Sequence, residues 1–237
     1  MGSPALTSSI DWGNVAQWTA AIATFLAVII ALFKEEFINL WRRPKLVATI
    51  KLSPPDSTKT PVIITYPRPP EPPITKEASS YYFRLWIKND GKARAEKVQV
   101  FAEKLCRKAA DGTFLPVEGF MPMNLRWTHS GEIFTEGISP LMGKHCDLGH
   151  ITHPAELIDL QEDHPDAQGK TVLALELEAK PLTKSHLVAP GTYKLTLRIA
   201  GSNCQPTTTT LEITLIGDWY EDTGRMFRDG IAIKVLD

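Results

Sequence analysis

An uninterrupted apolar segment dominates the start of the hydrophobic pattern. From Val15 to Phe33, nineteen consecutive residues carry no charge. A helix of this length spans about 28 Å, close to the hydrocarbon thickness of a bilayer. Trp12, Trp18 and Trp41 lie near the two ends, where indole rings favour the membrane interfaces. The pattern predicts one transmembrane helix. The alternative is a buried helix of a soluble core, but such helices seldom avoid charge on every face.

Basic residues follow the apolar segment and do not precede it. The chain has no Lys or Arg before Lys34, so it lacks the basic start of a cleaved signal peptide. Positive charge comes afterwards, at Lys34, Arg42, Arg43 and Lys45, and basic flanks usually lie on the cytoplasmic side. We therefore expect a single-pass inner-membrane protein with its N-terminus outside and its C-terminal domain in the cytoplasm.

Changes in the pattern divide the chain into three parts. Residues 1–10 are expected to be a disordered N-terminus. Residues 11–43 are expected to form the transmembrane helix with an amphipathic extension that Pro44 ends. Residues 44–237 are expected to form one β-sandwich domain with a Pro-rich insertion at 53–75.

Small residues recur at four-residue spacing within the predicted membrane helix. Ala23, Ala27 and Ala31 would leave a shallow stripe on which another helix packs, with Gln17 and Thr24 able to hydrogen-bond across. One interpretation is self-association through this face, giving a homo-oligomer. The other is that alanine is simply common in such helices.

The periodicity becomes strand-like after Pro44. Residues 46–52 alternate, but eight prolines between Ser53 and Thr75 predict an extended loop in which only residues 62–66 pair as an edge strand. Residues 81–88 then alternate strongly. Their core face is predicted to be Phe83, Leu85 and Ile87, and the opposite face Tyr82, Arg84, Trp86 and Lys88.

This strand ends in the turn Asn89-Asp90-Gly91, and the next is predicted to direct Val98, Val100 and Ala102 to one side. The two form either a long hairpin or a corner between sheets. Further strands are predicted at 113–117, 125–128, 145–148, 171–179, 192–199 and 207–216, the last two as a closing hairpin. Short helices are predicted at 155–160 and 219–228. Many short strands with few helices predict a two-sheet sandwich.

Two of these strand segments resemble a known kind of domain. NDGKARAEKVQV, from Asn89 to Val100, resembles the strand–turn–strand of immunoglobulin-like bacterial domains, and GTYKLTL, from Gly191 to Leu197, resembles their closing strand. With the N-terminal anchor, LRW at 125–127 and CDLGHI at 146–151, the chain is similar to bacterial single-pass membrane proteins of unknown function. The resemblance implies a mainly β, immunoglobulin-like antiparallel sandwich after one transmembrane helix, and it carries no catalytic residue.

Composition narrows the function classes. With 26 basic and 27 acidic residues the formal net charge is -1, so binding to duplex nucleic acid is not expected. Three cysteines at wide spacing, Cys106, Cys146 and Cys204, form no paired motif and are typical of a reducing compartment.

Two sets of side chains are candidates for chemistry. His145, Cys146, His150 and His153 are potential zinc ligands, but alternation along a strand would point Cys146 and His150 one way and His145 the other. We therefore expect no metal or other cofactor. Tyr82, Arg84, Trp86 and Lys88 would form a face suited to stacking and phosphate binding, or simply an exposed sheet face.

The sequence contains no nucleophile elbow, phosphate-binding glycine loop or framed pair of carboxylates. The leading hypothesis is a non-catalytic, membrane-anchored module, a sensor or scaffold, that binds an unknown protein or small molecule beside the lipid bilayer. The alternative is a membrane effector of a bacterial stress or phage-defence system that oligomerises through its helix on ligand binding. A metalloprotein or hydrolase built around residues 145–153 is the third hypothesis.

Overall fold

The computed structural model describes residues 12–156 and 164–236 of the chain, without the side chains at 12–14, 35–41, 64–68 and 76. The chain divides into two compact units, Met1–Arg42 and Arg43–Asp237. The expected disordered segment 1–10 lies outside the described residues.

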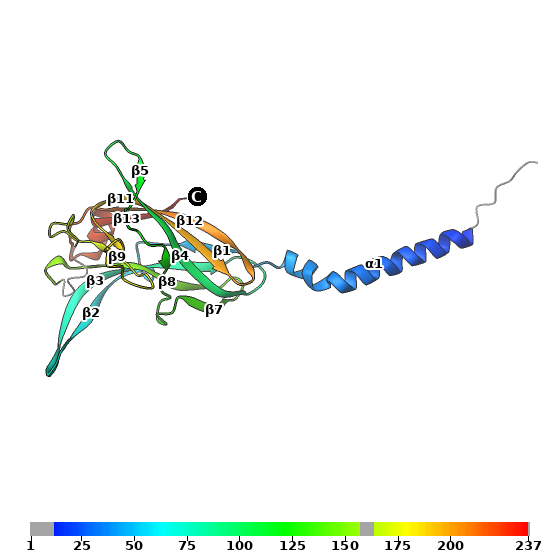
Figure 1. Ribbon diagram of the computed structural model, residues 1–237, viewed down its shortest axis with the longest axis horizontal. Coiled ribbons are helices and arrows are strands. Elements are labelled where there is room, and N and C mark those ends of the chain that lie inside the picture. The colour runs from blue at the N-terminus through cyan, green and yellow to red at the C-terminus, as the bar shows by residue number, and fades with distance from the viewer. Residues whose placement is uncertain (1–11, 157–163, 237) are drawn as a thin grey trace, which may run out of the picture. The chain divides into compact units, whose positions relative to one another are not determined.

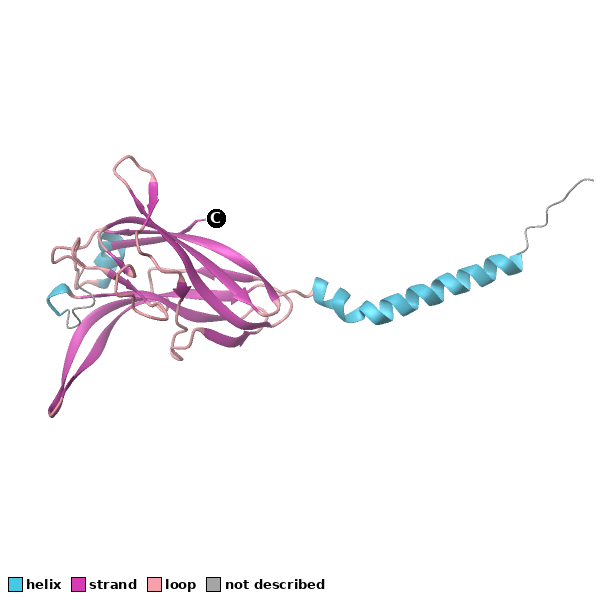
Figure 2. Cartoon of the chain, viewed as in Figure 1, coloured by secondary structure: helices cyan, strands magenta, loops and turns pink. Residues whose placement is uncertain are grey.

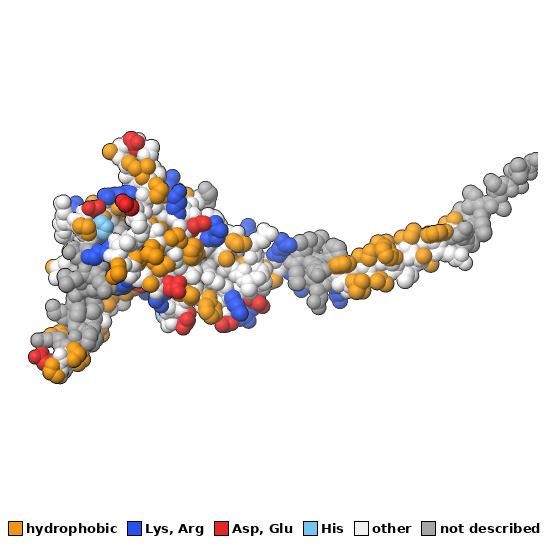
Figure 3. Space-filling view, in the orientation of Figure 1, with side chains coloured by type: hydrophobic (Ala, Val, Ile, Leu, Met, Phe, Trp, Pro, Cys, Tyr) orange, Lys and Arg blue, Asp and Glu red, His pale blue; other side chains and the backbone are white. Residues whose placement is uncertain are grey.

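The first unit contains one helix, α1, which runs from Trp12 to Trp41. Within it, Val15–Lys34 is an apolar stretch of 20 residues with a mean hydropathy of 2.1, none of it buried inside the protein. Figure 3 shows hydrophobic side chains along this stretch. The prediction of an N-terminal apolar helix is confirmed, and its length and composition suit either a membrane anchor or a signal sequence.

The side chains expected at the membrane interfaces are described only in part. Trp18 is 66% exposed, and Arg42 and Arg43, which follow the helix, are exposed as well. The side chains of Trp12 and Trp41 lie outside the described residues. The amphipathic extension is helical as far as Trp41, so the helix ends three residues before Pro44.

The small residues Ala23, Ala27 and Ala31 of α1 are all exposed. A surface on which another helix packs must be exposed in this way. The Thr24 hydroxyl does not fit the expected role. Its Oγ1 donates a hydrogen bond of 2.8 Å to the Ala20 carbonyl of its own helix. A threonine hydroxyl in a helix commonly bonds back in this way, because the carbonyl one turn earlier lies within reach.

The second unit is built almost entirely of strands in two antiparallel sheets (Figure 2). The order in the first sheet is β1-β3-β8-β9-β10, with β2 also paired to β3. These strands are β1 (Leu46–Thr49), β2 (Ser57–Arg68), β3 (Glu71–Asn89), β8 (Gly143–Thr152), β9 (Leu173–Leu175) and β10 (Leu187–Val188).

The order in the second sheet is β13-β12-β11-β4-β5, with β6 and β7 also paired to β4. Its strands are β4 (Ala95–Lys108), β5 (Phe114–Pro116), β6 (Met123–Asn124), β7 (Phe134–Ile138), β11 (Gly191–Gly201), β12 (Cys204–Leu215) and β13 (Ile231–Leu236). Short helical turns are η1 (Pro154–Glu156), α2 (Thr223–Arg225) and η3 (Met226–Gly230). The mainly β character with two antiparallel sheets is confirmed.

One hydrophobic core is shared by both sheets. The predicted core face of β3 is fully buried, as is the predicted inner side of β4: Phe83, Leu85, Ile87, Val98, Val100 and Ala102. Alternate residues of a strand point to opposite sides, so one buried face fixes the other as the outer face. The predicted alternation of residues 81–88 is therefore confirmed.

The Pro-rich stretch was expected to be mainly loop, and this expectation is wrong. Strands β2 and β3 pair from Ser57 with Phe83 to Arg68 with Glu71, forming a long hairpin that extends as a narrow ribbon in Figure 1. Prolines are tolerated because β2 has only β3 as a neighbour, and β3 pairs with β8 only from Ser80 onwards. A proline removes no ladder hydrogen bond where its nitrogen faces a free edge.

The sequence left open whether β3 and β4 form a hairpin or a corner between sheets. They form a corner, because the two strands belong to different sheets. Asn89 at this corner is fully buried. Its Oδ1 accepts from the backbone N–H groups of Lys45 (3.1 Å) and Gly91 (3.0 Å). Its Nδ2 donates to the carbonyls of Ala93 (2.7 Å) and Ile138 (2.9 Å). The side-chain amide thus makes four hydrogen bonds, two as acceptor and two as donor.

The same corner holds the backbone that follows helix α1. The Asp90 N–H donates to the Lys45 carbonyl over 2.7 Å, and the Lys92 N–H donates to the Arg43 carbonyl over 3.3 Å. A Cβ at Gly91 would lie 2.3 Å from the Arg43 carbonyl oxygen, so only glycine permits this approach. We call residues 43–45 with 89–92 the corner clamp. The Asn and Gly expected to serve only a turn also fix the start of the β unit.

Later elements agree with the sequence in part. The closing hairpin is confirmed as β11 and β12, which pair from Gly191 with Leu215. The strand expected at 125–128 is wrong, since only isolated bridges occur at Leu125 and Trp127. The helix expected at 219–228 is reduced to α2 and η3. Most of the helix expected at 155–160 lies outside the described residues.

Candidate functional site

The outer face of the first sheet carries the side chains expected to meet a ligand. Tyr82, Arg84, Trp86 and Lys88 lie on this face of β3, and all four are half-buried. Burial of the alternate side chains beneath them holds the strand in place, so their spacing is set by the sheet. Lys88 pairs with the neighbouring Asp90 carboxylate at 2.7 Å.

Strand β8 adds further polar side chains to this face through an irregularity in its pairing. The register of β3 and β8 shifts so that Tyr82 lies opposite His150 but Arg84 lies opposite Asp147. The extra residue on β8 reverses the alternation, as a β-bulge does. His150 therefore lies on the same outer face as His145, with Asp147 between them, and the expectation that it points with Cys146 is wrong.

Two of the outer-face side chains are held by their neighbours. Arg84 Nε lies 3.4 Å from the Asp147 carboxylate, and its NH1 donates to the Thr58 hydroxyl over 3.2 Å. The Tyr82 ring stacks on the His150 ring with centroids 5.2 Å apart. His150 Nδ1 in turn lies 2.6 Å from Glu176 Oε1. These contacts favour a structural role for this half of the face.

Asp147 carries an electrostatic cost within this network. Burial raises the pKa of its carboxyl group, outweighing the Thr128 hydroxyl, which donates to Oδ1 over 2.6 Å, and the charge of Arg84. A carboxyl whose pKa is raised by folding binds its proton more tightly in the folded state than in the unfolded state. Its contribution to stability is therefore present at low pH and is lost as the pH rises.

We expect Asp147→Asn to change the pH dependence of stability. The wild-type free energy of unfolding should fall, relative to the variant, as the pH rises from below the usual value of 3.8 through the raised pKa of the folded state. Asparagine keeps an acceptor for Thr128 and removes the titration. Urea unfolding of both proteins between pH 3 and pH 8 measures the difference, and a difference that stays constant with pH would contradict the assignment.

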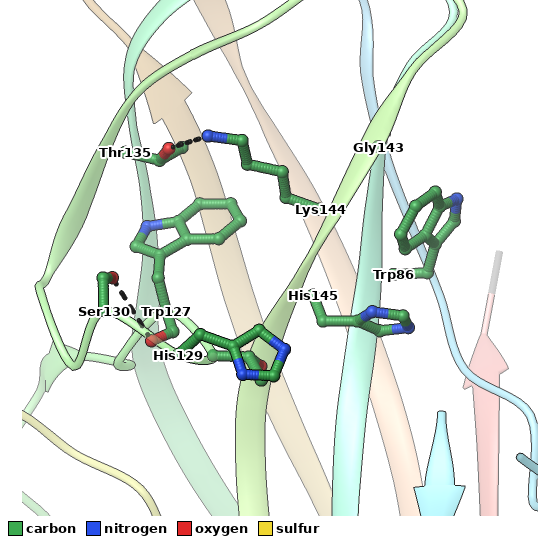
Figure 4. A pocket seen from close by; sticks show the side chains of 9 residues that line it. Trp86, Trp127, His129, Ser130, Thr135, Gly143, Lys144 and His145 are labelled. Atoms are coloured by element: carbon green, nitrogen blue, oxygen red, sulfur yellow. Dashed lines mark hydrogen bonds between the residues drawn. The ribbon is translucent and has the colours of Figure 1, made fainter. Parts of the chain in front are cut away.

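The other half of the face opens on a hollow of about 520 Å³, here the Trp86 hollow (Figure 4). Trp86 and His145 come from β3 and β8, and Lys144 extends to donate to the Thr135 hydroxyl over 2.7 Å. The lining residues are Trp86, Trp127, Thr128, His129, Ser130, Thr135, Gly143, Lys144 and His145. Among the described residues, no carboxylate lines this hollow.

The position of the Trp86 indole depends on a glycine. A Cβ at Gly143 would lie 2.4 Å from Trp86 Cε2 and 2.5 Å from Cζ2, so the ring rests against the Gly143 backbone. The His145 ring lies beside it, with centroids 4.7 Å apart and planes tilted by 57°. Trp86 is thereby fixed against the sheet while it borders the hollow.

A second hollow of about 420 Å³, here the Asp56 hollow, shares Trp86 and His145 with the first. Its other lining residues are Thr49, Lys51, Ser53, Pro54, Pro55 and Asp56. Asp56 Oδ1 lies 3.1 Å from His145 Nε2, and its Oδ2 accepts from the Lys51 backbone N–H over 3.0 Å. The acidic group is thus already engaged, while the Lys51 side chain borders the open space.

The candidate metal ligands do not come together. Cys146 is fully buried, and its thiol donates to the Arg126 carbonyl over 3.4 Å. His145 contacts Asp56, and the His153 ring lies edge-on to Trp219 with centroids 5.0 Å apart. Within the described part of the chain, no group of three His, Cys, Asp or Glu side chains is arranged to hold a metal ion.

Sequence reasoning missed several side chains of the two hollows. Asp56 lies in the stretch expected to be a loop insertion. Thr128 ends the strand expected at 125–128, which did not form, and His129 and Ser130 follow it. His129 has a φ of 71°, a left-handed conformation that is uncommon outside glycine. The sequence offered no signal for these positions, because contacts between distant segments bring them to Trp86.

Comparison with known proteins found no relative of this chain. No family model, curated protein or solved structure matches this chain. The class that the fold defines is an N-terminal apolar helix followed by two antiparallel β-sheets, with no family identified.

Proposed function

We propose that this protein is a single-pass membrane protein whose β unit is a non-catalytic ligand-binding module in the cytoplasm. The observation that carries the proposal is the Trp86 hollow, an open site next to a fixed indole and the Lys144 ammonium group, in a chain with a helix long enough to span a bilayer. The basic residues after that helix, Lys34, Arg42, Arg43 and Lys45, support a cytoplasmic β unit.

The non-catalytic part of the proposal rests on how His145 is bonded. His145 and Asp56 form a histidine–carboxylate pair through Nε2, whereas in a Ser-His-Asp triad the carboxylate holds Nδ1 and Nε2 faces the nucleophile. A triad also requires a nucleophile bonded to the imidazole. In the described part of the chain, no hydroxyl or thiol side chain is hydrogen-bonded to His145; the nearby Ser130 hydroxyl donates to the Trp127 carbonyl over 3.5 Å. A binding role for the hollow needs no such nucleophile.

The strand order supports the immunoglobulin-like relationship. In the first sheet β1, β3 and β8 are adjacent, and in the second β4, β11 and β12 are adjacent. These follow the orders A-B-E and C-F-G of immunoglobulin domains. The arrangement departs from that fold where β9 follows β8 in the chain, where β2 is inserted, and where β13 extends the second sheet. We propose an immunoglobulin-like sandwich with these three modifications.

The corner clamp favours a second candidate function, the ligand-driven membrane effector. Only Arg42 separates the last helical residue, Trp41, from the clamped segment 43–45, so a change at the β3–β4 corner would occur close to the helix along the chain. Self-association through Ala23, Ala27 and Ala31 would then be the output. This candidate requires an oligomeric state that changes with ligand, and a constant state with ligand bound at saturation would exclude it.

A thermal-shift screen tests the leading proposal. Full-length protein in uncharged lipid nanodiscs is heated with a library of neutral, cationic and anionic metabolites. A ligand at 100 times its Kd should stabilise the β unit by about 2.7 kcal/mol. We expect at least one compound to raise the Tm of the wild type and of Lys234→Ala, an exposed lysine on β13, but not of Trp86→Ala. Mass spectrometry should recover that compound unchanged.

Two results would contradict the proposal. A ligand that stabilises the wild type and Trp86→Ala equally would place binding outside the Trp86 hollow. A ligand that is recovered chemically converted would show that the protein is an enzyme.

A further inference from the structure

The Trp86 hollow and the Asp56 hollow share two lining side chains, Trp86 and His145, and together they are called the recess. The rings of these two side chains lie 4.7 Å apart. Both hollows therefore border the same aromatic pair. A flat ligand in either hollow would meet the indole, and indole faces stack on planar rings of every base type.

Two lysines lie at this centre. Lys144 lines the Trp86 hollow together with the His129 imidazole, and Lys51 lines the Asp56 hollow. In the described chain the one carboxylate among the lining residues is Asp56, which already contacts His145 and the Lys51 N–H. The balance of charge favours an anion. Lys144 leaves β8 on the opposite side from His145, toward Thr135, whose hydroxyl accepts its one side-chain hydrogen bond among the described residues (Figure 4). The side chain is exposed and flexible, so its ammonium group is able to meet an anion at the edge of β8.

Hydroxyl groups complete the lining of the Trp86 hollow. Thr128, Ser130 and Thr135 contribute them. Thr128 and Ser130 already donate to Asp147 and to the Trp127 carbonyl, whereas Thr135 accepts from Lys144 and keeps its own proton to donate. Hydroxyls donate to phosphate or carboxylate oxygens and also accept from sugar or ring N–H and O–H groups. A hollow of about 520 Å³ lies within the range that holds small organic ligands.

We propose that this recess binds a planar heteroaromatic ring that carries an anionic group, the chemistry of a nucleoside phosphate. The ring stacks on Trp86, and the anionic group lies toward Lys144 and the hydroxyls of the Trp86 hollow. This inference rests on the function proposed above and specifies the ligand class of the same site. Of the residues that the sequence predicted as a ligand face, this proposal keeps only Trp86. Tyr82 is held by His150 and Arg84 by Asp147.

The test separates the ring from the charge. Full-length protein in uncharged lipid nanodiscs is titrated with AMP, adenosine and ribose 5-phosphate by isothermal titration calorimetry. We expect AMP to bind at least tenfold more tightly than either fragment, and its affinity to fall as NaCl is raised because salt screens the cationic side chains. Equal affinity for AMP and adenosine would overturn the anionic part, and equal affinity for AMP and ribose 5-phosphate would overturn the stacking part.

Variants assign each part to its residue. Trp86→Ala should weaken AMP binding by tenfold or more. Lys144→Ala, which alters an exposed side chain and leaves the core untouched, should weaken AMP binding about fivefold without changing adenosine binding. Lys234→Ala is the matched control and should leave both unchanged. AMP binding that is insensitive to Lys144→Ala and Trp86→Ala would overturn the proposed pose.

The failure of this inference is distinguishable from failure of the proposed function. If AMP does not bind but a neutral or cationic compound from the thermal-shift library does, and Trp86→Ala abolishes its effect, the ligand class is wrong and the binding module stands. If no compound distinguishes the wild type from Trp86→Ala, both are wrong.

Discussion

Asn89→Ala should lower the free energy of unfolding of the β unit by about 4 kcal/mol. The reason is that the buried Asn89 amide makes four hydrogen bonds, and each such bond contributes about 1 kcal/mol net. Alanine would leave the Lys45 and Gly91 N–H groups and the Ala93 and Ile138 carbonyls without this partner. Urea unfolding followed by circular dichroism measures the loss.

Asp90→Ala is the matched control for this prediction. Asp90 is the next residue, exposed, and its carboxylate pairs with Lys88 on the surface, where an ion pair contributes at most about 1 kcal/mol. Its backbone N–H, which donates to the Lys45 carbonyl, is kept in the variant. If Asn89→Ala costs no more than Asp90→Ala, the corner clamp is not an important source of stability.

Leu26→Arg combined with Ile30→Arg should release the protein from the membrane fraction. Leu26 lies near the middle of the 20-residue apolar stretch of α1, Ile30 lies one turn further on, and both are exposed. An arginine at the centre of a membrane helix costs about 3 kcal/mol for insertion and less toward the ends, so the pair costs at most about 6 kcal/mol. Alkaline extraction of membranes separates integral from loosely bound protein.

The control for this second effect is Leu26→Ala with Ile30→Ala, which shortens both side chains without adding charge. We expect the control to stay in the extracted membrane pellet with the wild type. A double-arginine variant that also stays in the pellet would show that α1 does not hold the protein in the bilayer.

Strong local patterns predicted the parts of the fold that depend on one segment. The uncharged stretch from Val15 predicted α1, and the alternation along residues 81–88 predicted both faces of β3. In each, a single physical requirement, an apolar surface or one buried face, repeats at every period of the element. No partner segment is needed to recognise it.

The β8 strand shows why the predicted site was incomplete. Strict alternation predicted that His150 points to the same side as Cys146. The bulge before His150 shifts the alternation by one residue, so His150 points to the other side. Gly149 was the available signal, because glycine within a strand often marks a bulge or a close approach. A Cβ at Gly149 would lie 2.4 Å from the Ala174 carbonyl oxygen of β9, so the glycine is required by a strand more than twenty residues away.

Long-range contacts also explain the other differences. The prolines of β2 and β3 are compatible with a hairpin only because these strands have free edges, which a sequence pattern does not reveal. Asparagine is typical of turns, so the sequence predicted only a turn at Asn89. Its buried hydrogen bonds with Lys45 and Ile138 depend on the packing of three separate segments.

The most direct test of a membrane-anchored cytoplasmic module is the side on which the β unit lies. Lys234→Cys places a thiol on an exposed position of β13, for labelling with a membrane-impermeant maleimide before and after cell lysis. Native thiols contribute little: Cys106 and Cys146 are buried, and burial raises the pKa of both Cys146 and Cys204. A Cys204→Ser background removes Cys204, which is the only one of the three native thiols that is not buried.

We predict labelling only after lysis, on a membrane-bound chain of the full 26.3 kDa. Labelling of intact cells would reverse the orientation and place the β unit outside the cytoplasm. A soluble labelled chain shortened at its N-terminus would show that α1 is a cleaved signal sequence, and would contradict the membrane anchor itself.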